Sequence, residues 1–360
     1  MGQSPDSATY NEVGRGLPFF QGNADFGRLH PAVRVWCSEP TKIAHTGDIL
    51  ISVRAPIGAM NVADQDCCIG RGLAAIRVNE NICDPQYLWY AIQSKVSDLN
   101  VKGTGSTFKA ISKSTLTDTE VLLVPLDAQK NIASVLSNVE NSILFRKEQL
   151  TKLDELIKAR FVEMFGTYPD NPFGWNTGKI QDVVSNVRYG SSRPAVEGGK
   201  YPYLRMNNIT YAGELDLTDT KRIDVPDSEL DKCTVQRGDV LFNRTNSKEL
   251  VGKTCVYNRD DMMVLAGFVI RVRVNERILP EFLVAFLNTA FSKQMLLGMC
   301  KTAIGQANIN AKEMQNIGLY IPPIALQEQF VDLKKQTDKS KLLAELFAQS
   351  TCILAENRSK

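Results

Sequence analysis

The chain has 360 residues, a formal net charge of +2, and 43% hydrophobic and 23% charged residues, which is typical of a soluble globular protein with two or three domains. The longest apolar runs have strand length and the N-terminus MGQSPDSATYN is polar, so we expect no membrane span, no signal peptide and a cytoplasmic location. Eight scattered Cys without a CxxC pair, and only two His, argue against a zinc site and against a disulfide framework.

The first 125 residues predict a small mixed domain. Residues 1–30 are rich in Gly, Ser, Asn and Asp, which predicts loops around one short strand at 17–21. Alternating apolar residues predict further strands at 47–54 and 73–78, and the apolar spacing at 85–97 predicts a helix. The segment 102–113 combines Lys with Ser and Thr and has no acidic residue, which suits contact with phosphate groups; the alternative is a solvated connector.

Residues 126–165 contain neither Gly nor Pro and predict one long helix. Apolar side chains recur there at alternating steps of four and three, which forms a heptad seam of the coiled-coil kind. The seam consists of Ile132, Leu136, Val139, Ile143, Leu150, Leu153 and Ile157. At 1.5 Å per residue the helix is roughly 55 Å long, so we interpret it as a spacer.

The chain on either side of this helix is repeated. GDILISV at residue 47 is echoed by GDVLFNR at 238, LAAIRVN at 73 by FVIRVRVN at 268, and VPLDAQ at 124 by IPPIALQEQ at 321. A second helix follows the second copy, with a weaker seam that includes Phe330, Leu333 and Phe347. We therefore expect four parts, at residues 1–125, 126–165, 166–322 and 323–360, in the order domain, helix, domain, helix.

The two copies differ at their beginnings. YGSSRP at residue 189 aligns with MGQSP at residue 1, so the strand-like segment 175–188 of the second copy has no visible counterpart in the first. The first module is accordingly expected to be short at its N-terminus, by about fifteen residues: either the sequence begins late or another segment fills that place, and a module without the strand would have an unpaired sheet edge.

No catalytic motif is complete. VGKT at 251–254 lacks the glycine that a phosphate-binding loop requires five positions earlier, and DPQY at 84–87 lacks both the middle proline of the methyltransferase motif and a cofactor loop elsewhere. His30 and His45 have no Ser or Cys signature beside them. We expect no catalytic residue, no metal and no cofactor on this chain.

Two similar modules, each followed by a long helix, resemble the specificity subunit of type I restriction-modification systems. The resemblance rests on the GQSP…PFFQG run at 2–22, the two GD(I/V)L strands and the two strand-proline-helix junctions named above, and it covers essentially the whole chain. It implies an α+β protein with two tandem α/β target recognition domains, separated by two long helices that pack as an antiparallel coiled coil. It further implies that each domain reads one half of a gapped DNA site, while the helices set the gap and dock two modification (methyltransferase) subunits. Restriction subunits are further partners in such systems, and S-adenosylmethionine and ATP would be bound by the partners only.

Arg, Asn and Gln side chains at strand ends, and the basic hydroxyl-rich loops, are the candidates for contact with double-stranded DNA. In the first module these are Gln21, Asn23, Arg54, Lys102, Thr104, Ser106, Thr107 and Lys109; in the second they are Arg188, Ser191, Ser192, Arg205, Asn207, Arg244, Asn246, Lys301 and Gln306. Bulk charge lends no support to DNA binding, so a coiled-coil interaction scaffold without DNA affinity remains the alternative.

Overall fold

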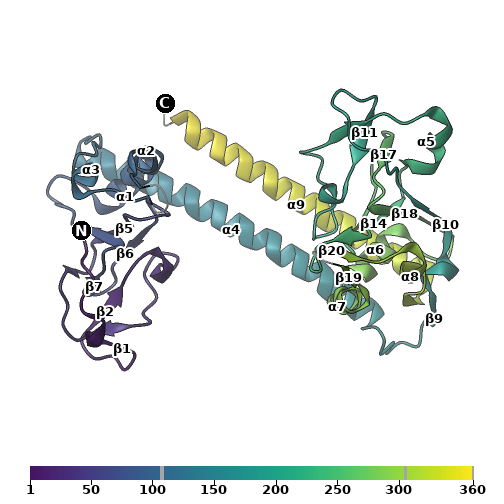
Figure 1. Ribbon diagram of the computed structural model, residues 1–360, viewed down its shortest axis with the longest axis horizontal. Helices are drawn as coiled ribbons and strands as arrows, with labels where there is room; N and C mark the ends of the chain where they lie inside the picture. Colours follow the sequence, from purple (N-terminus) through teal and green to yellow (C-terminus); the bar gives the residue numbers. More distant parts are fainter. Residues whose placement is uncertain (106–108, 304–305, 359–360) are drawn as a thin grey trace. The chain divides into compact units, whose positions relative to one another are not determined.

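A computed structural model describes residues 1–105, 109–303 and 306–358, and gives only the backbone path for 301–303, 306 and 345–358. It divides into two compact units, one made of residues 1–144 and 350–360 and the other of residues 145–349 (Figure 1). The candidates Ser106 and Thr107 lie outside the described residues. Each unit is an α+β structure, as the sequence predicts, and is built around two principal sheets.

The first unit contains a three-stranded antiparallel sheet and a five-stranded mixed sheet. The first has the order β6 (Met60–Val62), β5 (Ile49–Ser52), β8 (Leu73–Ile76), and the second the order β1 (Tyr10–Asn11), β3 (Trp36–Cys37), β2 (Leu17–Phe20), β7 (Cys67–Ile69), β4 (Ile43–Ala44). Its short helices are α1 (Pro85–Ser94), α2 (Val96–Lys102) and α3 (Lys113–Thr117), with 3-10 turns at Ser7–Thr9 and Asn23–Asp25. The helix predicted at 85–97 is therefore divided into α1 and the start of α2.

The second unit repeats both sheets and adds two small ones. The principal sheets are β10 (Val184–Tyr189), β18 (Val269–Val274), β14 (Val240–Asn243), β16 (Thr254–Val256), and β12 (Lys221–Ile223), β11 (Tyr201–Leu204), β17 (Met263–Leu265), β13 (Thr234–Val235). The small ones are β15 (Thr245–Asn246), β20 (Gln306–Asn308), β19 (Lys301–Ala303), and β21 (Gly318–Ile321), β9 (Asn176–Lys179). The helices are α5 (Asp227–Cys233), α6 (Pro280–Leu287), α7 (Ala290–Met299), α8 (Ala311–Gln315) and α9 (Ile324–Arg358), of which residues 350–358 belong to the first unit, with 3-10 turns at Ile180–Val183 and Met206–Asn208.

The pairing of the strands confirms the internal repeat. The parallel pair β2–β7 corresponds to the parallel pair β11–β17, and β5 lies between β6 and β8 as β14 lies between β16 and β18. The alignment of MGQSP with YGSSRP also holds in detail. The Gly2 N–H donates to the Leu73 carbonyl at 2.8 Å, and the Gly190 N–H donates to the corresponding Val269 carbonyl at 3.3 Å.

The two Gly-Asp motifs have the same structural role. Gly47 and Gly238 have φ values of +88° and +90°, which only glycine adopts readily, and the aspartate that follows each of them is buried. Asp48 accepts from Arg77 Nε at 2.9 Å, and Asp239 accepts from Arg273 Nε at 2.8 Å. Each ion pair therefore connects the start of the central strand to the end of its neighbour.

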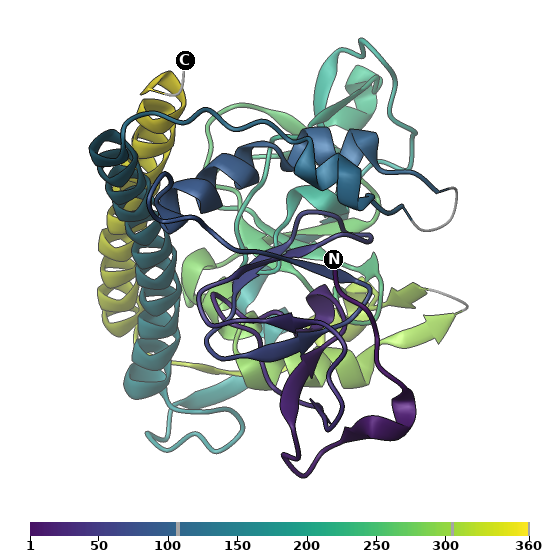
Figure 2. The same ribbon diagram turned by 90° about the vertical axis from the view of Figure 1, so that its left-hand side faces the viewer.

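The helix predicted from the heptad seam is α4 (Leu126–Phe165), and its C-terminal part packs against α9 inside the second unit (Figures 1 and 2). Phe161 lies edge-on to Phe330 with ring centroids 5.3 Å apart, and Asp154 forms an ion pair with Lys341. Residue numbers rise along α9 as they fall along α4, so the two helices are antiparallel.

The seam residues of α4 differ in burial. Leu136, Val139, Ile143, Leu150, Leu153 and Ile157 are partly buried, whereas Ile132 is 40% exposed. Beside Ile132, Ala133 is buried and packs on Cys83 and Tyr87 of the first unit. On α9, Phe330 is fully buried and Leu333 partly buried, and the backbone at Phe347 is helical.

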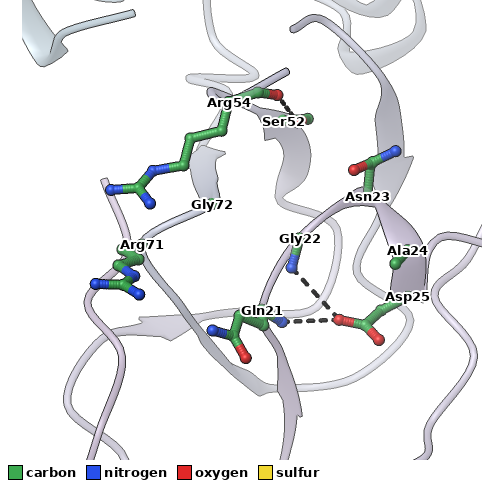
Figure 3. A pocket seen from close by; sticks show the side chains of 9 residues that line it. All are labelled: Gln21, Gly22, Asn23, Ala24, Asp25, Ser52, Arg54, Arg71 and Gly72. Atoms are coloured by element: carbon green, nitrogen blue, oxygen red, sulfur yellow. Dashed lines mark hydrogen bonds between the residues drawn. The ribbon is translucent and has the colours of Figure 1, made fainter. Parts of the chain in front are cut away.

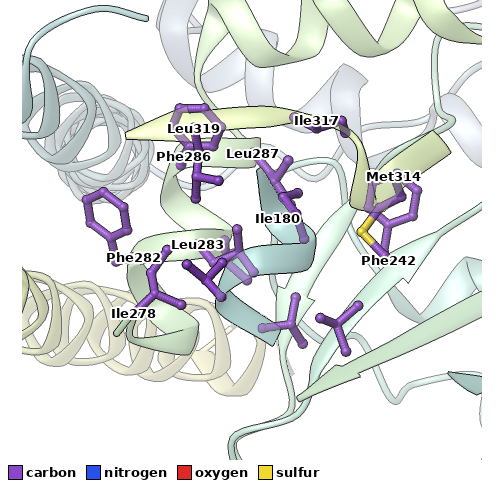
Figure 4. Close-up of a cluster of buried hydrophobic side chains, with 14 of the residues drawn as sticks. Ile180, Phe242, Ile278, Phe282, Leu283, Phe286, Leu287, Met314, Ile317 and Leu319 are labelled. Atoms are coloured by element: carbon purple, nitrogen blue, oxygen red, sulfur yellow. The ribbon is translucent and has the colours of Figure 1, made fainter. Parts of the chain in front are cut away.

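The largest core lies in the second unit, under helix α6 (Figure 4). Phe282 and Phe286 of α6, Phe242 of β14 and Leu319 of β21 are all fully buried there. Burying one such side chain contributes about 1.5–3 kcal/mol. Among the described helices none is by itself long and apolar enough to cross a membrane; α6 and α7 meet that criterion only as a pair, and the pair is bent by 70°.

Candidate nucleic-acid interface

Three sequence-predicted residues of the first module line one pocket. Gln21 follows β2, Asn23 begins the adjoining 3-10 turn, and Arg54 follows β5. The pocket has a volume of about 400 Å³ and is completed by Arg71 and by Ser52 (Figure 3). We call it the Arg54 pocket. It brings together the ends of two strands that belong to different sheets.

Close backbone approach shapes the floor of the Arg54 pocket. The Gly72 N–H donates to the Gln21 carbonyl at 3.2 Å, and a Cβ added at Gly72 would lie 2.3 Å from that carbonyl oxygen. The Gly70 N–H donates in the same way to the Phe20 carbonyl at 2.8 Å. The Gly70-Arg71-Gly72 turn therefore has to be glycine-flanked to fit under β2, and this fit positions Arg71 at the pocket rim.

The Arg54 pocket presents positive charge to a ligand. Its single carboxylate, Asp25, accepts the Gln21 N–H at 2.8 Å and pairs with Arg34 Nη2 at 2.8 Å. Arg54 and Arg71 extend along the opposite side of the pocket, are exposed, and form no ion pair with any described residue (Figure 3). Their guanidinium groups are thus available to phosphate or to an acceptor edge of a base.

The described parts of the segment 102–113, residues 102–105 and 109–113, adjoin Arg54 of this pocket. The Ala55 N–H donates to the Lys109 carbonyl at 3.0 Å, and Arg54 forms a β-bridge with Ala110. Lys102, at the end of α2, and Thr104 are exposed, as is Lys109. The backbone therefore places a basic loop beside Arg54, although the two segments are about fifty residues apart in the sequence.

The second module has arginines at the corresponding strand ends. Arg205 follows β11, as Gln21 follows β2, and its Nη2 donates to Asp219 Oδ2 at 2.8 Å. Arg244 follows β14; its guanidinium lies 4.9 Å from the Tyr189 ring centroid and its Nη2 donates to Asn308 Oδ1 at 3.3 Å. The Arg205 hydrogen bond and Lys221 hold the pKa of Asp219 below its usual range.

Both of these arginines retain an unused donor. The Nε atoms of Arg205 and Arg244 are buried and have no hydrogen-bond partner among the described residues. An unsatisfied buried donor costs about 1–3 kcal/mol, which a ligand or a water molecule at these strand ends would recover. Asn246 is partly buried nearby, and Asn207 is exposed on the turn after β11.

The remaining candidates of the second module differ in accessibility. Arg188 and Ser192 are exposed, but Ser191 is buried and its Oγ accepts the Arg193 N–H at 3.2 Å. Lys301 and Gln306 stand at the starts of β19 and β20, respectively, which pair with each other. The Ser191 hydroxyl therefore stabilises its own loop. For Lys301 and Gln306 the structure describes only the backbone, on the paired strands β19 and β20.

One arginine of the pocket, Arg71, was not among the sequence candidates. Arg71 lines the Arg54 pocket, yet no polar cluster in the sequence marks it, because it lies in a turn between two strands and is flanked by Gly70 and Gly72. The available signal was the Gly-Arg-Gly pattern, since two glycines around one charged residue indicate a tight turn that presents it.

The described residues define a protein with two copies of one polar surface. No group of three or more His, Cys, Asp or Glu in the described part of the chain could hold a metal ion. Instead, two homologous modules present arginine and amide side chains at equivalent strand ends, and each is followed by a long helix.

Comparison with known proteins identifies the family. The family model for the type I restriction modification DNA specificity domain matches residues 38–155 and 172–347. The chain belongs to this family, which confirms the resemblance seen in the sequence.

Relatives and solved structures agree with this assignment. A protein of Methanocaldococcus jannaschii, provisionally assigned as the type I restriction enzyme MjaX specificity subunit, is 39% identical over 158 residues, covering 44% of this chain and 37% of that protein. The EcoKI specificity subunit of Escherichia coli is 23% identical over 255 residues, covering 66% of this chain and 54% of the relative. The matched part is thus less than two thirds of the length of either relative.

Two solved structures share the fold. A type I restriction-modification S subunit from M. genitalium superposes with a TM-score of 0.55 at 15% identity, over 99% of this chain and 90% of that one. A chain from a structural study of complex assembly and conformational transition of the type I R-M system gives a TM-score of 0.60 at 18% identity, over 96% and 89% of the two chains.

Proposed function

We propose that this protein is the non-catalytic DNA-recognition subunit of a type I restriction-modification complex, in which each module reads one half of a gapped site. The observation that carries the proposal is the repetition of the site itself. Gln21 and Arg205 occupy the same position after β2 and β11, while Arg54 and Arg244 lie just beyond β5 and β14, with Arg244 one position earlier in the repeat than Arg54. Two copies of one fold with different side chains at the same strand ends suit a protein that reads two different half-sites.

The chemistry of these side chains suits base reading in the major groove. An arginine can donate two hydrogen bonds to O6 and N7 of guanine, and an asparagine or glutamine pairs in the same way with adenine. In the Arg54 pocket, Arg54 and Arg71 would supply the first kind of contact and Gln21 and Asn23 the second. Each good bidentate pair is worth about 1–3 kcal/mol of discrimination.

Phosphate contacts would supply most of the affinity. The Lys102 and Lys109 side chains, with Thr104, stand beside the Arg54 pocket and would bind the backbone of the duplex, as would Arg188 and Ser192 in the second module. Ser106 and Thr107 of the 102–113 segment, and Asn246, Lys301 and Gln306 on β15, β19 and β20 of the second module, remain proposed contacts. Acting on DNA would place the protein in the cytoplasm of its host.

We further infer that α4 and α9 set the distance between the half-sites and dock two modification subunits, with restriction subunits as further partners. The antiparallel packing of Phe161 on Phe330 and the Asp154–Lys341 ion pair support a rigid spacer. S-adenosylmethionine and ATP would be bound by those partner subunits, where the transfer and cleavage chemistry would take place.

The test measures the affinity of the chain, in complex with its modification subunits, for random-sequence DNA and for DNA enriched by selection for binding. The affinity is measured at increasing salt concentration. The proposal expects log affinity to fall linearly with log salt, with a slope of about −0.9 for each phosphate contacted. A chain that assembles with protein partners but has no DNA affinity, and hence no salt dependence, would instead be an interaction scaffold, and the proposal would be wrong.

A further inference from the structure

The second unit contains a pocket of about 220 Å³ that is lined by residues of α4, α6 and α9. Most of its wall is apolar and includes the buried rings of Phe161 and Phe330. Ala285 of α6 and the carboxylate residue Asp338 of α9 also line it. We call it the Ala285 pocket.

Helices α1 and α6 occupy the same place in the two modules. Each begins at a proline, and the N–H of the residue before that proline, Asp84 or Leu279, donates to the buried glutamine of the long helix that follows the module. Counted from these two residues, Tyr90 of α1 corresponds to Ala285 of α6. The second module therefore has a methyl group where the first has a phenol ring.

The phenol of the first module is bound by a carboxylate of the long helix. The Tyr90 hydroxyl donates to Glu140 Oε2 at 2.9 Å. Burial, together with this hydrogen bond, raises the pKa of Tyr90 to about 12, so the hydroxyl is protonated and acts as a donor. Counted from Gln129 and Gln327, Glu140 of α4 corresponds to Asp338 of α9. The second module thus keeps the carboxylate and lacks the tyrosine.

The Ala285 pocket has the size and the chemistry for one phenol ring. An apolar cavity of about 150 Å³ is large enough to bind benzene. Asp338 contacts Lys334 Nζ at 2.5 Å and Lys341 Nζ at 3.8 Å. Because an ionised carboxylate has about four lone-pair sites, Asp338 can accept a phenol O–H in addition to these contacts.

We propose that the Ala285 pocket receives a tyrosine side chain of the modification subunit, whose hydroxyl donates to Asp338. A second hollow, of about 520 Å³, shares Gly213, Val284 and Lys334 with the pocket and gives room for the polypeptide that carries the tyrosine. Aromatic side chains held in such pockets supply much of the binding energy of many interfaces. The inference rests on the proposed docking of modification subunits on α4 and α9.

The first module supplies the design of the test. Ala285→Tyr places a phenol on α6 where α1 carries Tyr90, so the chain would fill its own pocket. The affinity of the full-length chain for the modification subunit, measured by titration calorimetry, should then fall at least tenfold. The midpoint of urea unfolding of the free chain should stay the same or rise. Ala285→Ser leaves the pocket open, so this matched control should bind like the unchanged chain.

The free side chain of tyrosine, p-cresol, tests the pocket without a substitution. It is titrated into the full-length chain with isotope-labelled alanine methyl groups and followed by NMR. Saturable shifts are expected at Ala285 and Ala290, which line the pocket, and none at Ala133 of the first unit. Toluene, which lacks the hydroxyl that would donate to Asp338, should bind at least threefold more weakly.

The outcomes separate this inference from the proposed function. If Ala285→Tyr leaves the affinity for the modification subunit unchanged, the proposal is overturned. This holds even where p-cresol binds, because the pocket would then take a free phenolic ligand and not the partner's tyrosine. Absence of shifts at Ala285 and Ala290 would overturn it as well. An unchanged chain that binds no modification subunit would contradict the proposed function, and this inference with it.

Discussion

Gln129 and Gln327 make the same three hydrogen bonds in the two halves of the chain. The Oε1 of each accepts a backbone N–H from the start of a helix, that of Asp84 or of Leu279, at 2.8 Å. The Nε2 of each donates to two carbonyls, at residues 82 and 124 or at residues 277 and 322. Both side chains are fully buried, so one side-chain amide anchors each long helix to its own module.

Replacing either glutamine should destabilise the module that it fastens. Gln129→Met or Gln327→Met keeps the volume but leaves backbone groups buried without partners, and we expect a loss of roughly 2–4 kcal/mol in the free energy of unfolding. Urea unfolding measures it. Gln93→Met and Gln336→Met, at exposed helix positions, are matched controls and should change stability by less than about 0.5 kcal/mol. A small effect at Gln129 would show that the amide does not fasten α4.

The Asp48–Arg77 ion pair should make stability depend on pH. Burial alone would raise the pKa of Asp48, but hydrogen bonds from Arg77 and from the His45 N–H outweigh it and lower the pKa. A carboxylate with a lowered folded pKa stabilises the protein above its unfolded pKa of about 4 and loses that contribution as pH falls through the folded value.

Asp48→Asn should therefore cost about 1–3 kcal/mol at pH 7 and progressively less as the pH falls below about 4. Urea unfolding at several pH values gives both quantities. Asp64→Asn, at an exposed position in the same unit, should be neutral throughout. A cost that stays constant down to pH 2.5 would contradict the lowered pKa.

Lys293 should destabilise the folded protein at pH 7, whereas Asp48 stabilises it. Burial, with a smaller contribution from Lys253, lowers the pKa of Lys293 to about 8. Since the unfolded chain then binds more protons between pH 8 and 10.5, stability should rise with pH across that window.

Lys293→Met should accordingly stabilise the protein at pH 7, by up to about 3 kcal/mol. The gain should shrink as the pH approaches 10.5. The lost hydrogen bond to the Gly252 carbonyl and the lost contact with the Tyr211 ring reduce it. Lys248→Met, at an exposed position, is the control. Destabilisation at pH 7 that grows toward high pH would refute this prediction.

Arg54 and Arg71 should determine base preference in only one of the two half-sites. Replacing either with Ala should lower specific DNA affinity about 5- to 150-fold and relax base preference in that half-site, with the other half unchanged. Arg259→Ala, at a position paired with Asp261 outside the Arg54 pocket, is the control. Selection of bound sequences from a random pool provides the measurement, and a uniform loss over both halves would mean that these arginines contact phosphate only.

The length of α4 should set the gap between the half-sites. Deleting residues 139–145 removes one heptad and about 10 Å of helix, which corresponds to roughly three base pairs of B-DNA. The same selection should return both half-sites unchanged with a shorter gap. An unchanged gap would eliminate the spacer role of the helix.

The fold could be predicted from the sequence where the signal is local and repeated. The Gly-Asp strands, the heptad seam and the proline-helix junctions each occur twice or over many turns, so chance matches could be rejected. The roles of individual residues depend on contacts in the folded structure, which a local sequence pattern does not predict. Arg71 reaches the Arg54 pocket because glycines allow a close approach to β2, and Ser191 is withdrawn from the surface by its bond to Arg193.

Burial along the long helices was likewise only partly predictable. A heptad pattern selects Ile132, but the segment that packs there comes from α1 and reaches Ala133 instead. The period of a sequence gives the stripe that one straight partner helix would bury. It does not say where along the helix a different element takes the place of that partner.

The most direct measurement of the central claim is a map of methylated bases in a host genome, with and without this chain, in the presence of the modification subunit. The account predicts methylation at one two-part sequence with a fixed gap, which disappears when the chain is omitted. Methylation that is absent, or that occurs at a continuous site unaffected by changes to Arg54, Arg71 and α4, would contradict it.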